Sequence, residues 1–187
     1  MASAILFFND KEIFVQDKSS GLDLFKPYKI DVYSKFTEDR IKHLIQEHVI
    51  QKGIDIEEIL FNANEGILIP HEIYNPEKKE AYFTLNYPEI SEDKSIYDEK
   101  IDAINAHFIS TRFNWFVNFC SKNMPETPMM NSSKKYMDKI LSNQKEKNDV
   151  HIVLKDNTFD LIKLQNQKLF SFNCIEYTTV TDIIYFL

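Results

Sequence analysis

The chain has 187 residues, 43% of them hydrophobic, and a formal net charge of −7. Its length suits one domain or two small lobes, and its field repels phosphate backbones and anionic lipids, so we expect no nucleic-acid or membrane partner. No apolar run approaches the ~20 residues of a membrane helix, and no signal-peptide pattern precedes the first strand. We therefore expect a cytoplasmic protein, with Cys120 and Cys174 as reduced, buried thiols.

The first 53 residues predict three strands followed by a helix. Apolar runs indicate strands over residues 3–8, 12–16 and 28–33. Asn9 and Asp10 form the first turn. Thr37 is expected to cap the helix, with Phe36 and Ile41 spaced as a hydrophobic staple. Gly53 is expected to end it.

The middle of the chain predicts further short elements. Strands are expected over residues 57–62, 67–69, 79–85 and 101–109, with one helical turn over 71–75. Residues 89–100 are acidic and predict a loop, and 111–122 predict an aromatic helix. A second helix is expected to begin at a Ser132 or Ser133 cap and to run through Leu141, before a charged linker over 144–148.

The last 39 residues repeat the order of elements at the N-terminus. Strands are expected over residues 150–154, 159–164 and 168–177, with turns at Asp156-Asn157 and at Asn166. Thr179 and Asp182 have the spacing of a capping box. Both ends thus predict a β-β-β-α unit, an internal repeat. We place a first lobe at residues 1–148 and the start of a second lobe at 149–187, incomplete because its helix spans only nine residues.

Two segments resemble an uncharacterised family of Bacteroidetes proteins. Residues 68–74 match its LVP-x-x-[LIY]-[FY] motif, with Ile69 in place of Val. Residues 173–186 match N-x-F-x-[YF]-x-[TS]-x-x-D-x-[LI]-[YF]-[YF], with Ile175 in place of Phe. The resemblance implies an α/β, actin-like ATPase fold of two ribonuclease H-like lobes with mixed sheets and no assigned function. Family members also extend beyond the position that matches Leu187, which agrees with an incomplete second lobe.

Active proteins of this fold hold nucleotide phosphates in the first hairpin turn of each lobe, where glycine lets backbone amides approach the phosphate. An acidic residue in such a turn holds magnesium through water. The corresponding turns here, FFNDKE and LKDNTF, contain Asp10 and Asp156 but no glycine, because the three glycines are Gly21, Gly53 and Gly66. Asp10 and Asp156 are therefore candidates for ATP and magnesium only if the loops have diverged. Ordinary turn chemistry also accounts for an aspartate at each position.

The remaining candidates predict no catalytic residue, metal site or cofactor. His71-Glu72 lacks a second histidine four residues after His71, so the zinc-protease helix motif is absent. The carboxylates of residues 89–99 are typical of a solvated loop. The preferred hypothesis is a non-catalytic actin-like protein that acts through a protein partner, or through self-association of its C-terminal unit. The alternative is an ATP-dependent phosphotransferase or ATPase with diverged phosphate loops.

Overall fold

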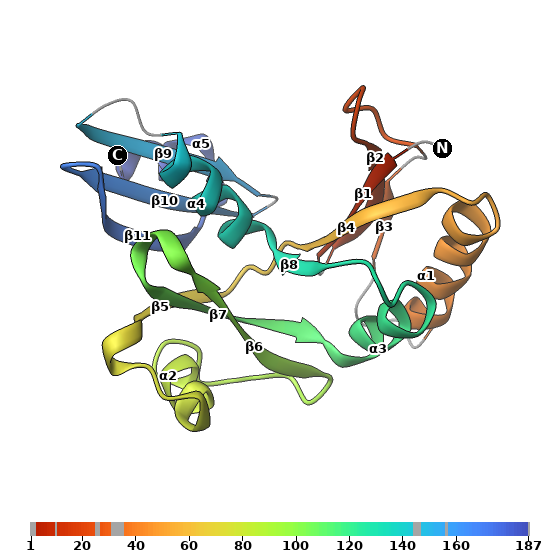
Figure 1. Ribbon diagram of the computed structural model, residues 1–187, viewed down its shortest axis with the longest axis horizontal. Helices are drawn as coiled ribbons and strands as arrows, with labels where there is room; N and C mark the ends of the chain where they lie inside the picture. Colours follow the sequence, from red (N-terminus) through yellow and green to blue (C-terminus); the bar gives the residue numbers. More distant parts are fainter. Residues whose placement is uncertain are drawn as a thin grey trace. The chain divides into compact units, whose positions relative to one another are not determined.

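The computed structural model describes residues 3–9, 11–24, 27–30, 36–143, 147–155 and 157–186 (Figure 1). The chain divides into two compact units, each made of two segments. Unit 1 comprises Met1–Asn62 and Arg112–Met130, and unit 2 comprises Ala63–Thr111 and Asn131–Leu187. Because these units interleave along the chain, they do not coincide with the lobe boundary expected at residue 148, which stays a prediction. None of the described helices is both long and apolar enough to span a bilayer.

Unit 1 is built on a mixed five-stranded sheet in the order β3-β2-β1-β4-β8. Its strands are β1 (Ser3–Phe8), β2 (Glu12–Asp17), β3 (Tyr28–Lys29), β4 (Asp55–Phe61) and β8 (Met129–Asn131). Strand β1 pairs antiparallel with β2 and parallel with β4. The first two predicted strands are confirmed. Of the strand predicted over residues 28–33, the structure shows β3, and residues 31–33 lie outside the described residues.

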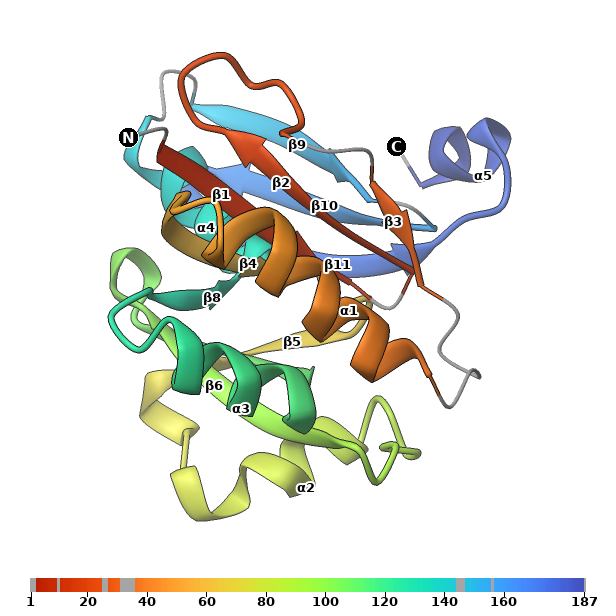
Figure 2. The same ribbon diagram turned by 90° about the vertical axis from the view of Figure 1, so that its right-hand side faces the viewer.

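Two helices complete the core of unit 1. They are α1 (Thr37–Ile45), which continues into the π-helical turn η1 (Gln46–Ile50), and α3 (Asn114–Asn123); Figure 2 shows α1 and α3 side by side. Phe8 stacks on Phe116 of α3 with ring centroids 3.8 Å apart. The predicted cap and staple are wrong. Phe36 is the N-cap residue, no side chain caps the helix, and Phe36 itself is 73% exposed. Gly53 has a φ of +62° after the helix, as expected of a stop.

The first part of unit 2 is a three-stranded sheet in the order β5-β7-β6. Its elements are β5 (Gly66–Pro70), η2 (His71–Ile73), η3 (Pro76–Lys78), α2 (Lys79–Thr84), β6 (Lys94–Ile101), η4 (Asp102–Ile104) and β7 (Ala106–Phe113). The strand predicted over 79–85 is wrong, because Asn75 caps a turn with Pro76 at its first position, and this turn leads directly into α2. The loop predicted over 89–100 is wrong from Lys94 onward: β6 is an edge strand, where charged side chains face water.

The second part of unit 2 is a β-meander with flanking helices. Its elements are α4 (Ser132–Ser142), β9 (Asn148–Leu154), β10 (Thr158–Gln165), β11 (Lys168–Glu176) and α5 (Val180–Tyr185). The sheet order β11-β10-β9 repeats the order β3-β2-β1, and each meander leads to a helix, as the sequence pattern predicts. The capping box of Thr179 and Asp182 is confirmed. The cap of α4 is Asn131 rather than a serine, since its side chain accepts from the Ser133 N–H.

Candidate functional site at the two hairpin turns

The β1–β2 and β9–β10 hairpins carry the residues that the sequence analysis singled out. Asp10 and Asp156 themselves lie outside the described residues, so their role stays a prediction. The two hairpins are equivalent in register: Phe8 pairs with Ile13 across the first turn, and Leu154 pairs with Phe159 across the second. The residues that flank each aspartate can therefore be compared position by position.

Asn9 organises the first turn. Its side chain is buried, and its Oδ1 atom accepts hydrogen bonds from the backbone N–H groups of Lys11 and Glu12, both at 2.7 Å. The Asn9 N–H in turn donates to the Glu12 carbonyl at 3.0 Å. Backbone amides of such a turn are the donors that would bind a phosphate. Here these amides already have an acceptor within the turn itself.

Lys155 holds the equivalent place in the second turn, and its side chain points into the interior of unit 2. That side chain is 2% exposed, and Asp160, its ion-pair partner in β10, is 0% exposed. The Lys155 Nζ atom lies 2.7 Å from Asp160 Oδ1, 2.8 Å from Ser133 Oγ and 3.2 Å from the Ala63 carbonyl oxygen. An ammonium group has three N–H donors. Each of the three N–H donors therefore has an acceptor, and the Asp160 carboxylate balances the lysine charge inside the protein.

The backbone of the second turn is fixed by Tyr177, at the end of β11. Its hydroxyl donates to the Lys155 carbonyl at 2.9 Å, and its backbone N–H donates to the Asn157 carbonyl at 2.9 Å. The Lys155 N–H closes the hairpin by donating to the Thr158 carbonyl at 2.9 Å. The sequence contained one signal of this cluster, namely a lysine and an aspartate that interrupt the apolar runs on either side of one turn.

Cys174 lies beside the Lys155–Asp160 pair, where burial disfavours its thiolate form. Its thiol donates to the Asn64 carbonyl at 3.1 Å, and burial raises its pKa to about 11. The thiolate is the reactive form of cysteine, and a pKa this high leaves almost none of it near neutral pH. Cys120, in the core of unit 1, has a pKa raised by burial to about 12. Both cysteines are free thiols, as predicted, although Cys174 is only partly buried.

A second polar cluster lies in unit 2, where η2 follows β5. His71 Nδ1 is 3.0 Å from His107 Nε2, and His107 Nδ1 is 3.5 Å from Asp98 Oδ2. The Tyr74 ring stacks on His107 with centroids 3.7 Å apart, and burial, followed by the neighbouring Asp98 carboxylate, raises the Tyr74 pKa to about 12. The sequence analysis did not bring these residues together, because His71 lies in η2 and His107 lies in β7, 36 residues further along the chain. They form a chain of contacts rather than a convergent ligand set, and the described residues contain no group suited to hold a metal ion.

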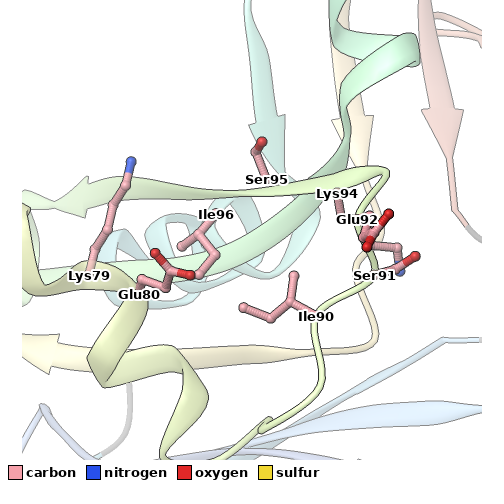
Figure 3. A pocket seen from close by; sticks show the side chains of 8 residues that line it. All are labelled: Lys79, Glu80, Ile90, Ser91, Glu92, Lys94, Ser95 and Ile96. Atoms are coloured by element: carbon pink, nitrogen blue, oxygen red, sulfur yellow. The ribbon is translucent and has the colours of Figure 1, made fainter.

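A shallow hollow of about 450 Å³ lies between α2 and the start of β6 (Figure 3). In the close-up, Ile90 and Ile96 lie between a Lys79–Glu80 end and a Ser91–Glu92 end. Lys94 and Ser95 complete the lining. Because each charged lysine is accompanied by a carboxylate, the hollow presents no net charge of one sign. Its lining therefore offers no excess of positive charge to an anion.

Comparison with solved structures shows which fold this arrangement belongs to. The chain is similar to a Bacteroides thetaiotaomicron protein with actin-like ATPase fold and unknown function, with a TM-score of 0.78 and 14% identity over 99% of this chain and 74% of that chain. It is also similar to a chain of the PilM-PilN type IV pilus biogenesis complex, with a TM-score of 0.50 and 9% identity over 94% of this chain and 62% of that chain. At these identities the likeness establishes the fold alone, and it confirms the predicted actin-like α/β class.

Comparison of the sequence gives the family but no activity. No curated protein matches the chain. Residues 13–187 match a family model described as "Protein of unknown function (DUF3822)". That match begins within β2, so it leaves out β1 and the first hairpin turn, and it includes the two segments that carried the resemblance. The chain therefore belongs to this family of unknown function, whose fold here is actin-like.

Proposed function

We propose that the chain is a non-catalytic member of the actin-like fold that acts in the cytoplasm through contacts with other proteins. The observation that carries this proposal is the state of the first turn, where Asn9 Oδ1 already accepts from the Lys11 and Glu12 amides. A phosphate bound there would have to displace this side chain, and no glycine is present in the turn to widen it.

The second turn supports the same proposal through its lysine. Releasing Lys155 to contact a phosphate would leave the Asp160 carboxylate buried without its partner. Removing one partner of a buried ion pair costs about 3–5 kcal/mol, and this amount would be subtracted from the free energy of nucleotide binding. The cluster is thus better suited to stabilise the hairpin than to bind a ligand.

Two further observations support protein contacts as the alternative to catalysis. A structural neighbour is part of the PilM-PilN type IV pilus biogenesis complex, so a related fold is found in at least one protein assembly. In this chain, α5 exposes apolar side chains, among them Val180, Ile184 and Tyr185. Exposed apolar groups gathered on one element are typical of a binding surface. The two free thiols agree with a reducing compartment.

Thermal unfolding with and without millimolar Mg-ATP tests the proposal. A ligand at 100 times its Kd stabilises the native state by about 2.7 kcal/mol, which raises the Tm of a chain of this size by roughly 5–11 °C. We expect no shift. An upward shift in Tm would refute the proposal if Asp10→Ala or Asp156→Ala abolishes it and the surface control Asp23→Ala does not. That result would favour the alternative, a phosphotransferase or ATPase with Asp10 and Asp156 at its nucleotide site.

A further inference from the structure

We draw no further inference here: the strongest candidate, the side-chain cluster of His71, His107 and Asp98 in unit 2, consists of groups that contact one another in a chain, and nothing in the described part of the structure shows what ligand or partner would meet the exposed His71 imidazole.

Discussion

The buried pair of Lys155 and Asp160 makes a quantitative prediction for Asp160→Asn. The carboxylate is completely buried and lies 2.7 Å from the ammonium nitrogen, so its loss leaves a buried cation without a countercharge. Breaking such a pair costs about 3–5 kcal/mol. The asparagine oxygen still accepts one hydrogen bond, and Ser133 Oγ and the Ala63 carbonyl remain, which places the cost at the lower end, about 3 kcal/mol. The Tm should fall by roughly 6–12 °C.

Urea unfolding followed by circular dichroism measures this cost, with an unchanged m-value as evidence that only stability has changed. The double variant Lys155→Met with Asp160→Leu is the informative partner, since apolar residues of similar volume often replace a buried pair without loss. We expect it to recover most of the stability lost in Asp160→Asn. A loss below about 1 kcal/mol in the single variant would refute the reasoning. So would a double variant no more stable than Asp160→Asn.

Three further predictions concern the turns and the core. Gly66→Ala should destabilise the chain by about 1–3 kcal/mol in urea unfolding, because the new methyl would lie 2.4 Å from Cζ of the buried Phe108 ring; a neutral effect would contradict it. Asn9→Ala should cost about 1–2 kcal/mol by the same measurement, because it removes the acceptor of two turn amides, whereas Asn9→Asp should retain it. Hydrogen bonds from Ser19, then Ser20, lower the Asp17 pKa to about 2. The contribution of these bonds to folding stability is therefore complete above about pH 4 and is lost as the pH falls through 2. An NMR titration of Asp17 with a midpoint near 4 would contradict this prediction.

The parts of the fold that the sequence predicted well are those governed by local chemistry. Asn166 and Gln167 adopt φ values of 52° and 60° in the two-residue turn between β10 and β11, at the turn predicted from Asn166. Thr179 and Asp182 form the predicted capping box, because both hydrogen bonds join residues three apart. In each case the conformation depends on a few neighbouring residues, so the pattern alone was sufficient.

Elements that depend on distant contacts were predicted less well. The segment 79–85 has alternating apolar residues, yet it forms α2, in which Phe83 is completely buried. β6 has few apolar residues and was missed, because an edge strand beside β7 needs only one partner and tolerates charge. The same limit applies to the candidate site. Lys155 Nζ contacts the carbonyl of Ala63, 92 residues away, and no local pattern predicts such a contact.

The two β-β-β-α units share a topology, and in each of them donors beside the first hairpin turn already have acceptors within the protein. In the first hairpin, Asn9 Oδ1 accepts from the Lys11 and Glu12 amides. In the second, the Lys155 ammonium has Asp160 Oδ1, Ser133 Oγ and the Ala63 carbonyl as acceptors. A ligand that used these particular donors would have to replace existing hydrogen bonds, so its net gain there would be small.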